Sequence, residues 1–126
     1  MLILKADRLG TTARVPVCYP VMFQTDWYLD EGEVLDLSLP GCAIESSRCL
    51  IPDEFVRLQV LLPHHAVRVE VAKVRWADGN RFGVEFLKMP EADKDLVFHL
   101  VREFYASNVG SYRAQTMSTW PPQVTI

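Results

Sequence analysis

Cysteine and histidine are scarce in this sequence, and their spacing indicates neither a cross-link nor a metal site. Cys18, Cys42 and Cys49 are an odd number, and no two of them have the C-x-x-C spacing of zinc and redox motifs. The thiols therefore fit a reducing compartment such as the cytosol. The adjacent pair His64-His65 falls in a predicted turn, where a solvated turn is favoured over a ligand pair. No metal site is predicted.

Long hydrophobic runs are missing as well. The chain starts MLILKADRLG, and the four apolar residues before Lys5 are too few for the core of a signal peptide. No later run approaches the roughly 18 apolar residues that a membrane-spanning helix needs. We therefore expect a cytoplasmic protein without a membrane partner.

The sequence also lacks an excess of positive charge. It contains 13 lysines and arginines against 16 acidic residues, which gives a net charge of -3. Domains that bind nucleic acid usually present a basic face, so neither DNA nor RNA is expected as a partner. Glycine-rich phosphate loops are absent, and Cys18 has no nearby histidine to activate it, so no catalytic residue is predicted. A small anionic ligand held by a few local arginines remains compatible with this composition.

What the 126 residues do contain is enough apolar side chain for one hydrophobic core. Apolar residues make up 49% of the chain. Short runs with alternating apolar residues, separated by turn residues, predict β-strands. There are six of them between residues 15 and 88: VPVCYPVMFQ, GEVLDLS, GCAIESS, EFVRLQVLLP, AVRVEVAKVRWA and RFGVEFL. The chain is therefore expected to be mainly β, forming an antiparallel barrel or sandwich.

The fifth run favours the barrel. Its apolar residues change phase, from Val67, Val69 and Val71 to Ala72, Val74 and Trp76. Such a change is typical of a β-bulge, which bends a strand as a small barrel requires. The residues after it, Asp78-Gly79-Asn80, predict a hairpin to the last strand. The expected fold is a small six-stranded antiparallel β-barrel.

A helix is predicted after the barrel. Pro90 is expected at its first position, with Glu91 and Asp93 in the first turn, where acidic residues suit the helix dipole. An apolar stripe follows, made of Leu96, Val97, Leu100, Val101 and Phe104, and it is expected to pack on the barrel. The predicted organisation is a flexible lead over 1–14, a barrel with its helix over 15–106, and an extended or disordered tail over 107–126.

The stretch DLSLPG interrupts an apolar run with an acid and a hydroxyl. Side chains two apart on a strand share a face, so Val34, Asp36 and Ser38 are expected outside, and Leu35, Leu37 and Leu39 in the core. Arg14 precedes the inward-facing Val15 and is also expected outside. Gly41 is expected to allow close approach of a ligand or a positive φ. A solvated strand end that closes in a Pro-Gly turn is the other interpretation.

These segments together resemble a known family. The order ARVPVCYPVMF, GEVLDLSLPGCAIES, VRW and FGVEF is similar to the PilZ domain, a bacterial receptor for the second messenger cyclic di-GMP, over residues 8–104. The signature of that family is R-x-x-x-R followed by [DN]-x-S-x-x-G. Its second half is present in full as Asp36, Ser38 and Gly41, and Arg14 fits the second arginine. The resemblance implies a PilZ-like barrel that binds cyclic di-GMP.

The first arginine of the signature departs from the family. Gly10 stands four residues before Arg14, and the nearest arginine is Arg8, which gives R-x-x-x-x-x-R. In the family the arginines contact the phosphates and guanines, and the acid and serine contact a guanine edge. Carried over to this chain, the implied ligand-binding residues are Arg8, Arg14, Asp36, Ser38 and Gly41.

Two functional hypotheses follow from the altered motif. In the first, the protein is a receptor and adapter that binds cyclic di-GMP and passes the signal to an unidentified protein partner. In the second, it binds no nucleotide and acts only as a protein-interaction module, as PilZ-like domains without these arginines do. A purely structural domain whose partners lie elsewhere is a third hypothesis. No cofactor is expected under any of these hypotheses, and cyclic di-GMP in the first one is a ligand.

Overall fold

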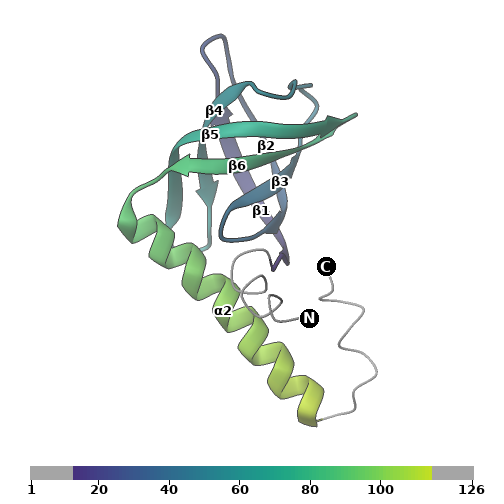
Figure 1. Ribbon diagram of the computed structural model, residues 1–126, viewed down its shortest axis with the longest axis vertical. Coiled ribbons are helices and arrows are strands. Elements are labelled where there is room, and N and C mark those ends of the chain that lie inside the picture. The colour runs from purple at the N-terminus through teal and green to yellow at the C-terminus, as the bar shows by residue number, and fades with distance from the viewer. Residues whose placement is uncertain (1–12, 115–126) are drawn as a thin grey trace.

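The computed structural model describes residues 13–114, with side chains as far as residue 107. Six antiparallel strands form a closed barrel with the ring order β1-β2-β3-β6-β5-β4 (Figure 1). Pairing of β4 with β1 closes the ring. The strands are β1 Val15–Gln24, β2 Leu29–Leu37, β3 Gly41–Glu45, β4 Phe55–Leu61, β5 Ala66–Asp78 and β6 Arg81–Lys88. The predicted six-stranded barrel is therefore confirmed.

The core is filled by alternate side chains from all six strands. On β1 the inward residues Val15, Val21 and Phe23 are buried, as the period of two predicts. The ring of Phe23 meets Phe82 of β6 edge to face, with centroids 5.5 Å apart, which joins two strands across the interior. Burial of such side chains is the main favourable contribution to folding, so this core fixes which residues face outward.

Strand β2 contains an irregularity that the sequence pattern does not reveal. Val34 and Leu37 are both buried although they are three residues apart, and Leu35 is only half-buried. The register of β2 against β3 shifts between Val34 and Asp36, which is the signature of a β-bulge. The prediction that Val34 faces outward and Leu35 inward is therefore wrong, because the bulge reverses the phase between them.

Strand β5 contains two such shifts. The one between Val71 and Ala72 lies where the change of apolar phase predicts it. A second shift lies between Val74 and Trp76, and Trp76 is 39% exposed. The expectation that Trp76 continues the inward set is therefore wrong, since the second bulge turns its side chain to the outer surface.

The turn between β5 and β6 follows its sequence prediction. Asp78 pairs with Arg81, which leaves Gly79 and Asn80 as a two-residue loop. Gly79 has a φ of 63°, a conformation that glycine adopts without steric cost. The predicted hairpin is therefore confirmed.

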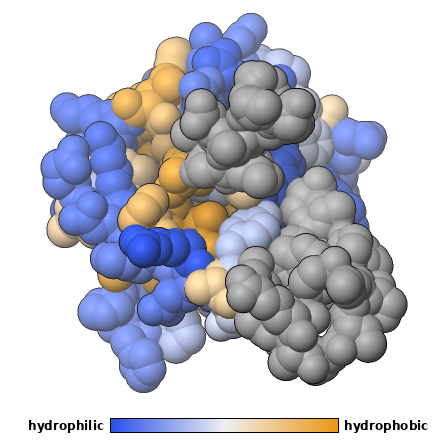
Figure 2. Space-filling model, turned by 60° about the horizontal axis from the view of Figure 1, so that its bottom comes forward, coloured by the Kyte–Doolittle hydropathy of each residue, from blue (hydrophilic) through white to orange (hydrophobic). Residues whose placement is uncertain are grey.

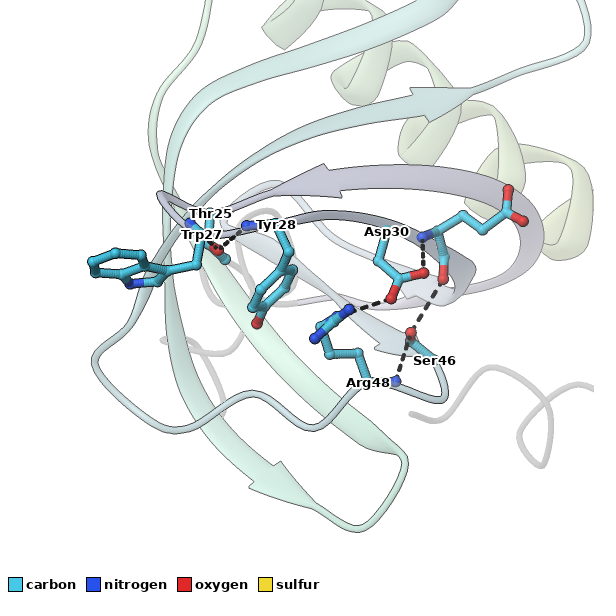
Figure 3. A network of polar contacts seen from close by, with 7 residues as sticks. Thr25, Trp27, Tyr28, Asp30, Ser46 and Arg48 are labelled. Atoms are coloured by element: carbon cyan, nitrogen blue, oxygen red, sulfur yellow. Dashed lines mark hydrogen bonds and ion pairs between the residues drawn. The ribbon is translucent and has the colours of Figure 1, made fainter.

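The β1–β2 hairpin is held by a network of polar contacts (Figure 3). The hydroxyl of Thr25 accepts hydrogen bonds from the backbone N–H groups of Trp27 and Tyr28. Arg48 lies 3.8 Å from the centre of the Tyr28 ring, and its Nε donates to Asp30 at 2.8 Å. Arg48 thereby ties the segment after β3 to this hairpin. The Trp27 side chain points away from the network and is 84% exposed.

Helix α2, Glu91–Ala114, follows the barrel. The carbonyl of Pro90 accepts a hydrogen bond from the N–H of Lys94, so Pro90 caps the helix instead of occupying its first position. Val97 and Val101 are buried against the barrel, and the packing contacts of α2 are chiefly with β5. The amphipathic helix predicted to cover the barrel is therefore present.

The end of the helix differs from its prediction. Helix α2 continues to Ala114, so residues 107–114 are helical. The prediction that these residues belong to an extended or disordered tail is therefore wrong. The remainder of the predicted tail and the lead as far as residue 12 lie outside the described residues. The described part of the chain includes no helix with the length and hydropathy required to cross a membrane.

Part of the outer surface is apolar. Figure 2 shows a band of hydrophobic side chains bordered by hydrophilic ones on the face that it presents. Among the described residues, the large apolar side chains that are exposed come from several different strands, loops and the helix: Trp27, Leu29, Ile51, Phe55, Leu61, Trp76, Leu87 and Phe98. Apolar surface that is gathered in one region is typical of sites where proteins bind a partner.

The bulge in β2 can be tested by truncating two neighbouring leucines. Leu37→Ala is expected to lower the free energy of unfolding by about 2–5 kcal/mol, as for other core leucines. Leu35→Ala removes the same atoms from a half-buried side chain, and a loss of about 1 kcal/mol is expected. Urea unfolding followed by circular dichroism measures both values. Equal losses for the two variants would contradict the bulge.

Candidate ligand-binding site

Arg14 and Asp36 form an ion pair at one side of the barrel. Arg14 precedes β1, and Asp36 lies on β2 beside the start of β1, where it pairs with Pro16. The Nη1 of Arg14 is 3.5 Å from Oδ2 of Asp36, and the two side chains are 49% and 27% exposed. Both project outward, as the strand pattern predicts. An ion pair this exposed contributes only about 0–1 kcal/mol to stability, so a ligand that replaces it loses little.

Ser38 has a different place from the one predicted. It is 7% exposed, and its backbone N–H donates to the carbonyl of Gly41 at 2.8 Å. Its hydroxyl also bonds to both backbone groups of Gly41, at 3.0 and 3.2 Å. The prediction that Ser38 stands on the outer surface is therefore wrong. Its side chain closes the turn between β2 and β3, a role that serine often has.

Gly41 is required by the packing of two strands. A Cβ atom at this position would overlap the carbonyl oxygen of Val84 on β6. Gly79 is the only described glycine with a positive φ, so Gly41 is not in the left-handed region. The expected positive φ is therefore wrong. The close approach that Gly41 permits in this structure is that of β6 to β3.

These four residues line one open pocket of about 230 Å³. The opposite wall comes from β5 and β6, where Arg75 Nε donates to Oε1 of Glu85 at 2.6 Å. The Trp76 indole lies against Gly83, since a Cβ atom at Gly83 would overlap its ring. The structure thus brings together two guanidinium groups, two carboxylates and one partly exposed indole.

Reasoning from the sequence misses three functional side chains of this pocket, Arg75, Trp76 and Glu85. The signal that identifies Arg75 and Trp76 is the second shift of strand register, between Val74 and Trp76. That shift depends on how β5 pairs with β6, and the order of apolar residues along β5 alone does not contain it. Arg8, the remaining predicted ligand residue, lies outside the described residues.

The charges of the pocket are balanced within it. Arg14 pairs with Asp36, and Arg75 pairs with Glu85. A ligand with anionic groups competes with these carboxylates for the two arginines, which match phosphate geometry well. A carboxylate released in this way is free to accept hydrogen bonds from N–H groups of the ligand. The indole offers a flat face for stacking. The arrangement suits a planar, anionic ligand with N–H donors.

The pocket shows no arrangement for covalent or metal chemistry among the described residues. Cys42 lines it, but burial, together with the negative charge of Asp36, raises the pKa of this thiol. The thiol is therefore neutral at physiological pH and a poor nucleophile. Within residues 13–107, no three histidine, cysteine, aspartate or glutamate side chains are grouped as a metal ion would need.

Comparison with known proteins gives one family and several similar structures. The model of the PilZ domain family matches residues 8–103. The PilZ domain of CeSA from a cellulose-synthesizing bacterium is 21% identical, with a TM-score of 0.59, and the match covers 73% of this chain and 97% of that one. No curated protein matches the sequence.

Two longer structures also match. The inhibitor of motility MotI/DgrA from Bacillus subtilis is 17% identical, with a TM-score of 0.66 over 75% of this chain and 50% of that one. YcgR from Escherichia coli, in complex with c-di-GMP, is 10% identical, with a TM-score of 0.56 over 82% of this chain and 49% of that one. At these identities the likeness shows a shared fold. This chain spans about half the length of both proteins.

The structural roles of Ser38 and Gly41 predict a graded loss of stability. Gly41→Ala forces β3 away from β6 and is expected to cost about 1–3 kcal/mol, as overpacking does. Ser38→Ala removes hydrogen bonds from a buried turn and should cost about 1–2 kcal/mol. Asp36→Ala, which breaks an exposed ion pair, should cost less than about 1 kcal/mol. Thermal and urea unfolding test the order. A Gly41→Ala variant as stable as Asp36→Ala would rule out the steric role.

Proposed function

The chain belongs to the PilZ domain family, and from this premise we propose that it is a cytoplasmic receptor and adapter that binds cyclic di-GMP and passes the signal to a protein partner. PilZ domains are receptor and adapter domains, and we propose no catalytic residue. One observation carries the proposal: residues far apart in the sequence line a single pocket. They are Arg14, Asp36, Ser38, Gly41, Arg75 and Trp76.

The chemistry of cyclic di-GMP fits the groups in this pocket. The ligand carries two phosphates and two guanines, so it offers anionic oxygens and flat rings whose edges have N–H donors. Arg14 and Arg75 supply guanidinium groups for phosphates or guanine edges. Asp36 supplies acceptors for guanine N–H groups, and Trp76 supplies a stacking surface. Ser38 and Gly41 act mainly by holding the turn that places Asp36.

One contact supports the adapter half of the proposal. The hydroxyl of Tyr105, on α2, donates a hydrogen bond to the backbone carbonyl of Arg14 at 3.1 Å. The residue that borders the pocket is therefore attached directly to the C-terminal helix. A ligand that repositions Arg14 acts on this bond, which gives the bound and free proteins different surfaces near α2. A ligand that binds one conformation of a protein more tightly than another shifts the equilibrium toward the first, by the difference between its two binding free energies.

A second candidate function rests on a specific observation, the glycine at the place of the first arginine. With Gly10 in that place, the motif offers one arginine fewer at its usual spacing. A charged hydrogen bond contributes about 1.5–3 kcal/mol, or one to two decades in affinity. Under this alternative the domain binds no nucleotide and acts only through protein contacts.

Calorimetric titration with cyclic di-GMP at near-physiological salt tests the receptor proposal. The wild type is expected to bind, and Arg14→Ala and Asp36→Ala should each weaken binding by about 10- to 100-fold, the equivalent of one charged hydrogen bond. Asp30→Ala is the matched control, because Asp30 forms an ion pair with Arg48 and does not line the pocket. A control as damaging as Asp36→Ala would contradict the assignment of the pocket.

The altered arginine motif gives a separate prediction. If Arg8 replaces the missing arginine, Arg8→Ala should weaken binding about as much as Arg14→Ala, and Gly10→Arg should add little. If the motif has decayed instead, the wild type binds poorly and Arg8→Ala changes nothing. Gly10→Arg should then raise affinity by about one to two decades. Titration of these variants separates the two cases. Failure of every variant to bind would leave only the protein-interaction function.

A further inference from the structure

On another side of the barrel, the guanidinium groups of two arginines form no ion pair with any residue that the structure describes, although the backbone N–H of one of them, Arg68, donates to Oδ2 of Asp93 at 3.0 Å. Among the lysine and arginine side chains that the structure describes, all but three form ion pairs. One of the three, Arg102, lies over the ring of Phe98. The other two are Arg57 on β4 and Arg68 on β5, which are both exposed. Unpaired arginines on a protein of net charge -3 are available for an anionic partner.

Both arginines line the same open hollow, of about 360 Å³. Apolar and amide side chains surround them. The amides of Gln24 and Gln59 form no hydrogen bond with any residue in the described part of the chain, and Leu29 is 59% exposed. Met22, Leu58, Val69 and Glu70 complete the lining. The hollow therefore combines two free cations, two free amides and exposed apolar surface.

The hollow continues along β4. A second hollow, of about 180 Å³, shares Gln24, Arg57 and Glu70 with the first and reaches Phe55, which is 55% exposed. The outward residues of β4 are Phe55, Arg57, Gln59 and Leu61, all exposed. Residues two apart on a strand are about 6.6 Å apart, so this row is about 20 Å long. We call the two hollows and this row the β4 groove. It has the length of several residues of extended peptide.

We propose that the β4 groove binds an extended acidic segment of a protein partner. This inference rests on the partner-binding half of the proposed function. The forked guanidinium groups of Arg57 and Arg68 match carboxylates. The free amides of Gln24 and Gln59 match the N–H and C=O groups of an extended backbone. Apolar side chains of the segment pack on Leu29 and Phe55.

The composition of the groove favours a peptide over other anions. Interfaces between proteins are enriched in arginine, methionine and aromatic residues, which this groove supplies at Arg57, Met22 and Phe55. Glu70 lines both hollows, Asp26 lines the second, and the two carboxylates repel a ligand that is anionic along its whole length, such as a nucleic acid. An inorganic ion would leave the exposed apolar side chains uncovered. A segment in which acidic and apolar residues alternate at every second position presents both kinds to the groove, because residues two apart on an extended chain share a face.

The groove also lies apart from the nucleotide pocket. In the ring order β4 is the strand opposite β3, and β3 carries Gly41 and Cys42 of the pocket. None of the residues that line the pocket lines either hollow of the groove. A partner segment and a nucleotide therefore have separate places on the barrel, and each surface has lining residues that can be substituted without changing a lining residue of the other.

The test uses the full chain, labelled with ¹⁵N, and a synthetic seven-residue peptide, Glu-Ser-Leu-Ser-Glu-Ser-Leu, with blocked ends, which places glutamate and leucine on the same face when extended. Saturable NMR shifts are expected at the side-chain amides of Gln24 and Gln59 and at the Nε atoms of Arg57 and Arg68. Combining Arg57→Gln with Arg68→Gln should weaken binding at least tenfold, because two charged contacts are lost. Arg102→Gln, the matched control, removes an exposed arginine outside the groove and should change affinity less than twofold.

Several results would overturn the inference. The first is that millimolar peptide causes no shifts, and the second is that the double variant binds the peptide as tightly as the wild type. The third is that a peptide with lysine in place of glutamate binds as tightly as the original one. The fourth is that inorganic phosphate or a single-stranded oligonucleotide causes the same shifts as the peptide. Cyclic di-GMP is titrated into the same samples, and the double variant should keep the nucleotide affinity of the wild type. A wild type that binds the peptide but no nucleotide contradicts the receptor proposal and supports the groove.

Discussion

The close approach of β3 to β6 is the constraint on which the pocket depends. Gly41 lies where any side chain would overlap the Val84 carbonyl, and the turn that leads to it is closed by hydrogen bonds between Ser38 and Gly41. Because this turn is fixed, the end of β2 is fixed, and Asp36 stands beside Arg14. The D-x-S-x-x-G motif therefore divides by role: the acid lines the pocket, while the serine and the glycine hold the chain that presents it.

The second constraint is that a closed barrel of six short strands has to bend. Its strands do so through bulges, where one extra residue changes the phase of the side chains. In β2 the bulge lets Val34 and Leu37 both enter the core while Asp36 stays at the surface. In β5 the second bulge sends Trp76 outward, where it lies against Gly83 and forms a wall of the pocket. The irregularities of the barrel thus create the site.

Sequence reasoning recovers what local patterns determine. Strand positions, the Val71/Ala72 bulge, the Gly79 hairpin and the outward direction of Arg14 all depend on residues close in the chain. The burial of Ser38 and the position of Trp76 depend on how β2 and β5 pair with other strands. This pairing cannot be predicted from the order of apolar residues along each strand. The helix end at Ala114 is missed for another reason: residues 107–114 are mostly polar and resemble a tail, although no proline interrupts them.

Three segments of the chain contribute to both the pocket and the β4 groove, and each changes register between the two. The segment from Arg14 to Gln24 has its shift between Pro16 and Tyr19. Strand β2 has its shift between Leu29, at the groove, and Asp36, at the pocket. Strand β5 has its shift between Glu70, at the groove, and Arg75, at the pocket. In β2 and β5 the shift reverses which alternate residues face outward, so that Leu29 and Asp36, and likewise Glu70 and Arg75, all lie on the outer surface. In β1 the alternation is unbroken from Val15 to Phe23, so Arg14 and Gln24 lie on the outer surface without such a reversal. The bulges of β2 and β5 therefore keep both ends of these strands available to the surface while the core between them stays filled.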